Sequence, residues 1–251
     1  MTVNTAGTKK TNQLMRICAI GLMAALVYAG NYLQIKIPNG VLVTRVHLGN
    51  SMCLLAGLLF GPLAGGVASG TGAMLFDLFD PVYIVSAPYT FLSKFAMGFA
   101  AGLLNRLLAD KLSEKFAAVT SAVIGQLVYI VLYLLKSYVS ILLLGGTHGE
   151  ALAAAGMNAV TSSINAVLAV IISVPLYFAL KTALSHSGFS AMIHEKELHF
   201  NYTAFNIVAI AVLMIGILFG GIYLANINKI AEKNAADQGL QTKAVIVNLI
   251  K

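Results

Sequence analysis

Long hydrophobic stretches separated by short polar segments dominate the chain. The first six stretches run over about residues 14–37, 48–60, 63–78, 84–108, 117–144 and 157–184. Their apolar residues are continuous rather than alternating, which predicts helices and excludes the strands of an outer-membrane barrel. A bilayer crossing needs about 20 mostly apolar residues. The pattern therefore predicts an all-α fold, a polytopic membrane helical bundle with a six-helix core in residues 1–186.

A further hydrophobic stretch, 204–225, follows a polar linker at 187–202. It predicts an additional, seventh transmembrane helix within residues 203–251, which end in a polar tail. A seventh crossing would place that tail outside, and its four lysines (Lys229, Lys233, Lys243 and Lys251) disfavour this location. A further span and a docking element both remain open for this segment.

Small residues recur at four-residue spacing in two of the predicted helices. They form the faces Ala25-x-x-x-Ala29 and Gly66-x-x-x-Gly70. The second face lies in the glycine-rich segment that follows the short stretch 48–60. Small residues let helices approach closely in lipid. Internal packing explains either face when it is considered alone.

The composition agrees with a membrane protein, since 59% of the 251 residues are hydrophobic and 10% are charged, against about 25% charged in soluble domains. The net charge of +7 comes with no basic cluster among aromatic residues, so it does not indicate nucleic-acid binding. Cations instead flank the apolar stretches, as Lys9, Lys10, Arg16, Arg106, Lys111, Lys115, Lys181 and Lys196 do. The positive-inside rule then predicts a multi-pass protein of the cell membrane with a cytoplasmic N-terminus.

Motifs for chemistry on nucleotides or metals are missing from the sequence. It contains no Gly-x-x-x-x-Gly-Lys-Ser/Thr loop for a nucleotide. The run 194–199, HisGluLysGluLeuHis, fails as a zinc-protease motif because Leu198 stands where the second histidine is needed. We therefore expect no catalytic residues, no metal site and no cofactor of the chain's own, and an intramembrane enzyme is the least supported hypothesis.

Lys94 lies near the middle of the fourth stretch, far from either end. A charge at that depth is costly, so it is a functional hypothesis by default. One interpretation is a structural pair with Asp77, and the other is a ligand for an anionic or carbonyl-bearing solute. The two interpretations are compatible.

Other polar residues gather at the predicted outer ends of the helices. Those in the last two core helices recur at three- and four-residue steps, which place them on one helical face. A polar lining with aromatic rings suits a neutral or zwitterionic heterocycle. The predicted substrate-binding residues are Asn31, His47, Asn50, Asp77, Tyr89, Lys94, Gln126, Tyr129, Tyr133, Asn158, Ser162 and Asn165.

A pattern spread over several segments is typical of one family. It comprises His47-Leu48-Gly49-Asn50, Leu59-Phe60-Gly61-Pro62, Asp77, Pro88 with Lys94 and Gly98, and the run at 165–181. With these residues the chain, over about 12–184, resembles the substrate-binding S component of energy-coupling factor (ECF) transporters, near the riboflavin-type branch. The extra stretch 204–225 departs from the family's six helices.

The resemblance implies a function and partners. The protein would bind a vitamin or related small heterocyclic micronutrient in an outward-facing pocket near the ends of helices four to six, capped by the loop after helix one. A transmembrane coupling subunit would contact Ala25 and Ala29, and two ATPase subunits would hydrolyse ATP. Which vitamin or precursor is bound stays open. A stand-alone secondary transporter of a small solute is the alternative, although the paired intramembrane carboxylates of many such transporters are not found.

Overall fold

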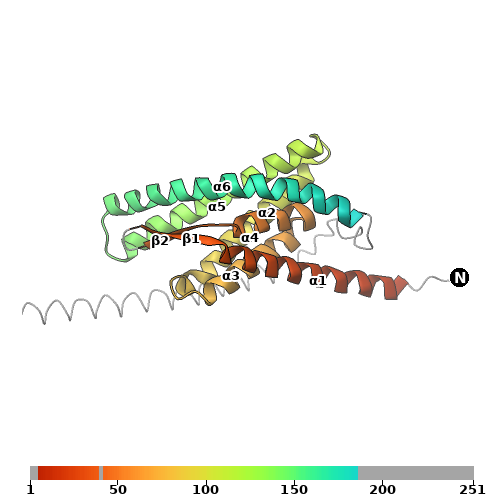
Figure 1. Ribbon diagram of the computed structural model, residues 1–251, viewed down its shortest axis with the longest axis horizontal. Helices are drawn as coiled ribbons and strands as arrows, with labels where there is room; N and C mark the ends of the chain where they lie inside the picture. The colour runs from red at the N-terminus through yellow and green to blue at the C-terminus, as the bar shows by residue number, and fades with distance from the viewer. Residues whose placement is uncertain (1–4, 40–41, 186–251) are drawn as a thin grey trace, which may run out of the picture.

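The computed structural model describes residues 5–39 and 42–185. Within these ranges six α-helices, one 3₁₀ helix and one two-stranded sheet follow each other (Figure 1). Their bounds are α1 (Thr5–Tyr32), β1 (Gln34–Asn39), β2 (Leu42–His47), α2 (Gly49–Phe60), α3 (Pro62–Leu78), η1 (Ile84–Ser86), α4 (Ala87–Leu108), α5 (Glu114–Leu143) and α6 (His148–Ser185). The predicted helical bundle is confirmed. The predicted linker and seventh helix lie outside the described residues.

Three of the described helices are long and apolar enough to cross a bilayer, over Leu14–Tyr32, Glu114–Leu143 and His148–Ser185. Large apolar side chains point outward along them, for example Val131 on α5 and Ile171 on α6, which are 65% and 63% exposed. Many buried side chains are polar. An apolar exterior around a partly polar interior is what a lipid-embedded bundle requires, because lipid rather than water surrounds it.

The short helix α2 is the centre of the bundle. Ten of its twelve residues are buried, and it contacts α1, α3, α4, α5 and α6. Several of its side chains, among them Leu54 and Leu55, are fully buried members of the hydrophobic core. Because other helices surround it, α2 need not match the thickness of the bilayer by itself.

Glycine permits the tight turn and close packing around α2. Gly61 joins α2 to α3 with φ +78°, a conformation that side chains rarely adopt, and Pro62 then begins α3. A Cβ on Gly57 would lie 2.4 Å from the carbonyl oxygen of Gly98 on α4. The backbones of α2 and α4 can therefore approach this closely only because Gly57 lacks a side chain.

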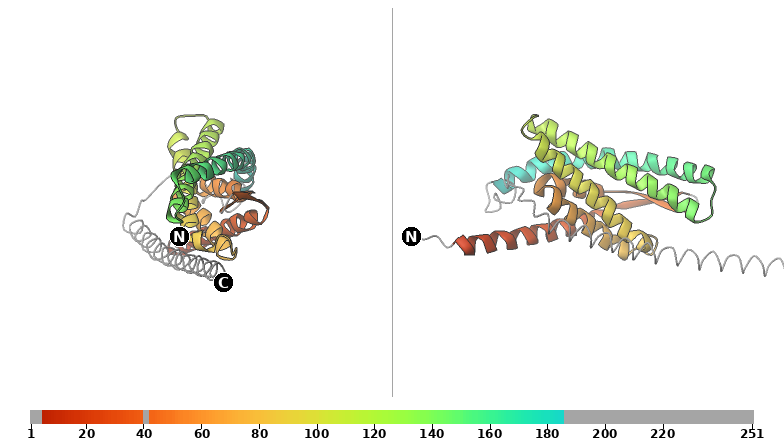
Figure 2. Two further views of the ribbon diagram at one scale, coloured as in Figure 1. Left: turned by 90° about the vertical axis from the view of Figure 1, so that its left-hand side faces the viewer. Right: turned by 180° about the vertical axis from the view of Figure 1, so that it is seen from behind.

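The helices are arranged around a β-hairpin near one end of the molecule. In Figure 1, α1 and α3 lie along the lower side and α5 and α6 along the upper side, with α2 and α4 between them. The start of α1, the α4–α5 connection and the end of α6 lie at one end, and the two views of Figure 2 place the hairpin toward the opposite end. This arrangement lets the hairpin contact α3 and α6 together.

The predicted extent of the first helix, through Ile37, was wrong. The helix ends at Tyr32, and the antiparallel strands β1 and β2 follow, with Gln34 opposite His47 and Lys36 opposite Arg45. In 34–37 polar and apolar residues alternate, which is the period of a strand. The mean hydropathy of this segment does not show that the apolar residues change from a helical spacing to a strand spacing.

The sixth helix also begins earlier than the predicted residue 157. It starts at His148, after a reciprocal cap in which the backbone N–H of Thr147 donates to Glu150 (2.7 Å) and the backbone N–H of Glu150 donates to Thr147 Oγ1 (3.3 Å). This Thr-x-x-Glu capping box satisfies donors that a helix start leaves free. It extends α6 outward past the end of the apolar stretch.

Candidate functional site

Two ion pairs tie the hairpin to the segment after α3. On β2, Arg45 donates to Asp77 Oδ1 at 2.5 Å, and the two side chains are 9% and 1% exposed. On β1, Lys36 donates to Asp80 Oδ2 at 2.6 Å in a more open setting. The Arg45 guanidinium also lies 4.2 Å from the ring centroid of Tyr83, which adds a cation–π contact. These pairs hold the hairpin against one side of the bundle.

A side-chain amide ties the hairpin to the other side. Asn165 on α6 donates to the carbonyl oxygen of Arg45 (2.8 Å) and accepts from the backbone N–H of His47 (2.9 Å). The amide thus provides one backbone carbonyl and one backbone N–H of β2 with hydrogen-bond partners, as a neighbouring strand would. His47 Nδ1 accepts from the backbone N–H of Gly49 at 3.1 Å, which fixes the histidine ring at the junction of β2 and α2.

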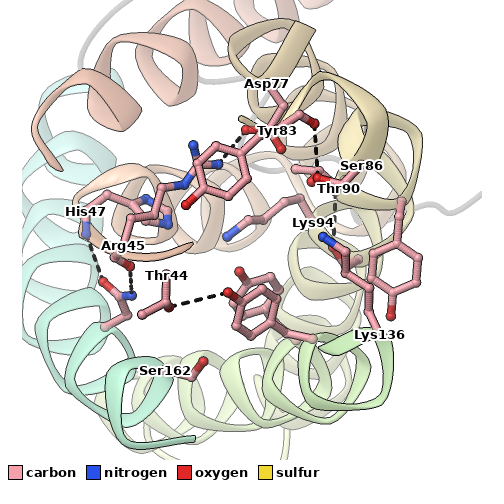
Figure 3. A pocket seen from close by; sticks show the side chains of 15 residues that line it. Thr44, Arg45, His47, Asp77, Tyr83, Ser86, Thr90, Lys94, Lys136 and Ser162 are labelled. Atoms are coloured by element: carbon pink, nitrogen blue, oxygen red, sulfur yellow. Dashed lines mark hydrogen bonds and ion pairs between the residues drawn. The ribbon is translucent and has the colours of Figure 1, made fainter. Parts of the chain in front are cut away.

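Beneath the hairpin lies a pocket bounded by η1, α4, α5 and α6 (Figure 3). Its lining is dominated by hydroxyl, aromatic and cationic side chains. It consists of Thr44, Arg45, His47, Asp77, Tyr83, Ser86, Tyr89, Thr90, Ser93, Lys94, Tyr129, Tyr133, Lys136, Ser162 and Asn165. The enclosed cavity is about 30 Å³, whereas the whole concavity with its opening is about 490 Å³. The enclosed space holds about one water molecule, so a vitamin-sized ligand requires side chains or the hairpin to move.

Lys94 extends from α4 into this pocket and is 2% exposed (Figure 3). Its ammonium donates to Asn50 Oδ1 and lies 3.6 Å from the ring centroid of Tyr129. The interpretation of Lys94 as the ion-pair partner of Asp77 is wrong for this structure, because Asp77 pairs with Arg45. An amide oxygen and an aromatic face take the place of a carboxylate beside Lys94.

Aromatic rings line the side of the pocket formed by α5. Tyr129 and Tyr133 stack with centroids 5.7 Å apart and planes at 16°. The Tyr133 hydroxyl reaches Thr44 of β2 at 3.4 Å, and the Tyr89 hydroxyl donates to the backbone of α5. Lys136 lies 5.9 Å from the Tyr89 ring centroid. The rings offer a flat apolar surface beside polar groups.

The loop between α3 and η1 carries two groups with shifted pKa values. Burial alone would raise the pKa of the Asp80 carboxyl, but hydrogen bonds from Lys36 and from the Val82 backbone N–H outweigh it and lower the pKa. Burial raises the pKa of Tyr83, against the opposite effect of Arg45. At neutral pH the loop therefore presents an ionised carboxylate to β1 and a neutral phenol to the Arg45 guanidinium.

Eight of the twelve residues predicted as substrate-binding line the pocket. They come from the hairpin and four other segments, and the fold brings them together from positions up to 118 residues apart. They are His47, Asp77, Tyr89, Lys94, Tyr129, Tyr133, Ser162 and Asn165.

The other four predicted residues are buried but do not line the pocket. Asn31 donates to the carbonyl of Val27 within α1 (2.7 Å), and Asn158 donates to a serine hydroxyl of α5 (2.7 Å). Asn50 donates to Gln126 (3.4 Å) below the pocket and accepts from the lysine of α4. Their side chains form hydrogen bonds inside the bundle, and Asn50 helps to position Lys94 of the pocket.

Several lining residues were not predicted, namely Thr44, Arg45, Tyr83, Ser86, Thr90, Ser93 and Lys136. Lys136 follows Tyr129 and Tyr133 at helical spacing, which is a signal that could have added it. Arg45 lies between the first two predicted helical stretches, outside both. Residues two apart in a strand share a face, so recognition of β2 would have placed Arg45 on the same face as His47.

The two small-residue faces have different surroundings. A Cβ on Gly66 or Gly70 would lie about 3 Å from Phe95 or Phe91 of α4, so that face packs internally. Ala25 and Ala29 are exposed on α1. The internal-packing interpretation therefore fits the face on α3 and does not fit the face on α1.

The described residues form a membrane bundle of six helices, with a hairpin over a polar pocket. In the described residues no group of three or more His, Cys, Asp or Glu could hold a metal ion. The sequence profile of the ECF-type riboflavin transporter, S component, matches residues 11–182. The chain therefore belongs to this family of transporter components, as the sequence resemblance predicted.

Solved structures with a similar fold agree with this assignment. The S component of a bacterial ECF transporter has a TM-score of 0.53 and 21% identity, over 69% of this chain and 99% of that one. The S component for biotin from an ECF-type ABC transporter has a TM-score of 0.52 and 17% identity, over 77% and 100%. At these identities the likeness concerns the fold alone. No curated protein sequence matches the chain significantly.

Proposed function

We propose that the protein is the substrate-specific subunit of an ATP-driven ECF importer and binds a vitamin or related small heterocycle beneath the hairpin. The observation that carries the proposal is the pocket, in which stacked tyrosines, hydroxyls and cations meet under a hairpin tied to both sides of the bundle. A flat apolar surface with a few placed polar groups suits a heterocycle.

The orientation follows from the ends of the helices. Arg106 and the lysines at 111 and 115 are in or next to the α4–α5 connection, at the same end as the start of α1. At that end Lys181 of α6 pairs with Glu114 of α5. The positive-inside rule assigns this end and the N-terminus to the cytoplasm. The hairpin and pocket then face outward, where a solute to be imported arrives.

The exposed Ala25 and Ala29 on α1 are the proposed contact for the transmembrane coupling subunit. They leave a shallow face without bulky side chains, on which a partner helix can pack closely in lipid. Two ATPase subunits bound to that coupling subunit would supply the energy. In this chain, solute entry would require the hairpin or lining side chains to move, and the proposed association would rearrange the bundle to release the solute inward.

Uptake into vesicles tests the proposal. The protein is reconstituted alone or with the coupling subunit and ATPases, and uptake of a bound solute is followed with and without ATP. We expect uptake only with all partners and ATP, and Ala25→Leu on α1 abolishes it while solute binding stays unchanged. Uptake by the protein alone that disappears with an ion gradient would instead establish a secondary transporter.

A further inference from the structure

Building on the proposed function of the same pocket, we propose that the solute is an anion at neutral pH, whose carboxylate or phosphate group pairs with Lys94 and Lys136. The sequence pattern by itself suited a neutral or zwitterionic heterocycle. The side-chain charges in the structure, and the way they are paired, favour an anionic solute instead.

The pocket holds more cations than carboxylates. Arg45, Lys94 and Lys136 are three cations and Asp77 is the single carboxylate, which gives a net charge of +2 with the histidine neutral. The carboxylate is engaged by Arg45 at 2.5 Å. Within residues 5–39 and 42–185, neither lysine forms an ion pair with a carboxylate.

The partners that Lys94 does have are neutral. Its ammonium, on a side chain that is 2% exposed, contacts an amide oxygen and the face of Tyr129. Both stabilise a cation, but neither cancels its charge. Lys136, which is half-buried, contacts a tyrosine ring. A buried cation is best compensated by an ionised acceptor, because charge-assisted hydrogen bonds are the strongest available.

Both lysines belong to the lining of the same pocket. They come from the adjacent helices α4 and α5 and both line the pocket (Figure 3). Arg45 adds a buried Nη1 that has no hydrogen-bond partner in the described part of the chain. A zwitterionic solute would need a free carboxylate for its cation, and the pocket's own carboxylate is already paired. The donors therefore favour an oxygen-rich anion.

Binding of matched anionic and neutral ligands to the purified full-length protein in nanodiscs tests this assignment. The pairs are riboflavin 5′-phosphate and riboflavin, biotin and biotinamide, nicotinate and nicotinamide, and pantothenate and pantothenol. We expect the anionic member of at least one pair to bind at least tenfold more tightly, which corresponds to about 1.4 kcal/mol. Lys94→Gln and Lys136→Gln should each reduce that ratio severalfold, and the affinity for the neutral member should change less than threefold.

Lys115→Gln is the matched control, because it removes the same charge from an exposed position at the other end of the bundle. It should leave the ratio unchanged. If Lys94→Gln binds neither member, the affinity ratio is measured instead in Lys136→Gln and in Lys94→Arg, which keeps the charge. Neutral members that bind as tightly as anions, or a ratio unaffected by both lysine substitutions, would overturn the anionic assignment and leave the proposed function standing. No binding by any pair or by any member of a wider vitamin panel would overturn the proposed function itself.

Discussion

Asn165 is predicted to hold the hairpin over the pocket, and Asn165→Ala removes both of its bonds to β2. Each buried hydrogen bond contributes about 1 kcal/mol net, and an unpaired buried group costs about 1–3 kcal/mol. The substitution should therefore ease opening of the hairpin by about 2–4 kcal/mol. Because about 1.4 kcal/mol is a factor of ten, local opening should become about 30-fold to 1000-fold more frequent.

Hydrogen–deuterium exchange with mass spectrometry measures this opening directly. Peptides over 34–47 should lose protection in Asn165→Ala, and the backbone N–H of His47 should lose it most. Peptides of α2 should keep theirs, because the core around Leu54 and Leu55 is unaffected. Ser163→Ala, two residues away on the exposed side of α6, is the control and should behave as wild type. Unchanged protection of the hairpin, or an equal loss in α2, would refute the account.

Three further predictions concern the hairpin and the helix packing. Asp77→Asn leaves Arg45 buried without a counter-charge, so thermal unfolding should show destabilisation of about 3–5 kcal/mol. Gly57→Ala drives a Cβ to within 2.4 Å of the α4 backbone, and over-packing of this kind should cost about 1–3 kcal/mol in the same assay. The pKa of Asp80 is lowered in the folded protein, so its contribution is present above the ordinary carboxyl pKa and is lost as the pH falls through the folded value. Exchange protection of β1, corrected for intrinsic rates, should decline on acidification, and Lys36→Gln should weaken that decline.

Each of these has a control with a distinct outcome. In a double variant Asp77→Asn with Arg45→Met the loss should be smaller than the sum of the two single losses, and additive losses would show that the ion pair contributes no coupling. Gly156→Ala adds a methyl group where no atom lies within 4 Å. It should leave stability unchanged or raise it by up to about 1 kcal/mol, because alanine favours a helix over glycine, and a loss equal to that of Gly57→Ala would reject the packing argument. A pH profile that is the same with and without Lys36 would exclude the Lys36–Asp80 pair as its cause.

The sequence predicts the features of this fold that depend on local composition. Continuous apolar runs are enough to predict the helices, and the isolated Lys94 stands out because a charge amid apolar residues is costly. The hairpin was not predicted, because its apolar residues continue the first hydrophobic stretch. Only the change from helical to strand spacing distinguishes it from the helix. Recognition of that change requires attention to 34–37 rather than to the mean hydropathy.

Pairing between distant residues is the part that sequence could not provide. The sequence suggested Lys94 as the ion-pair partner of Asp77, and the pairing with Arg45 instead depends on where β2 lies against α3. Asn31 and Gln126 have the same composition signal as true lining residues, yet their amides bond within the bundle. A polar side chain in a membrane helix predicts a buried partner, and tertiary structure decides whether that partner is protein or solute.

A small solute is proposed to bind in the pocket beneath the hairpin. Native mass spectrometry of the protein after mild purification from the membrane tests this proposal most directly. We predict one equivalent of a small heterocyclic solute bound to the wild-type chain, and its loss in Ser162→Leu, where a larger side chain fills the pocket. Wild-type protein that retains no solute and shows no saturable binding across a vitamin panel, or a solute equally retained by Ser162→Leu, would contradict the account.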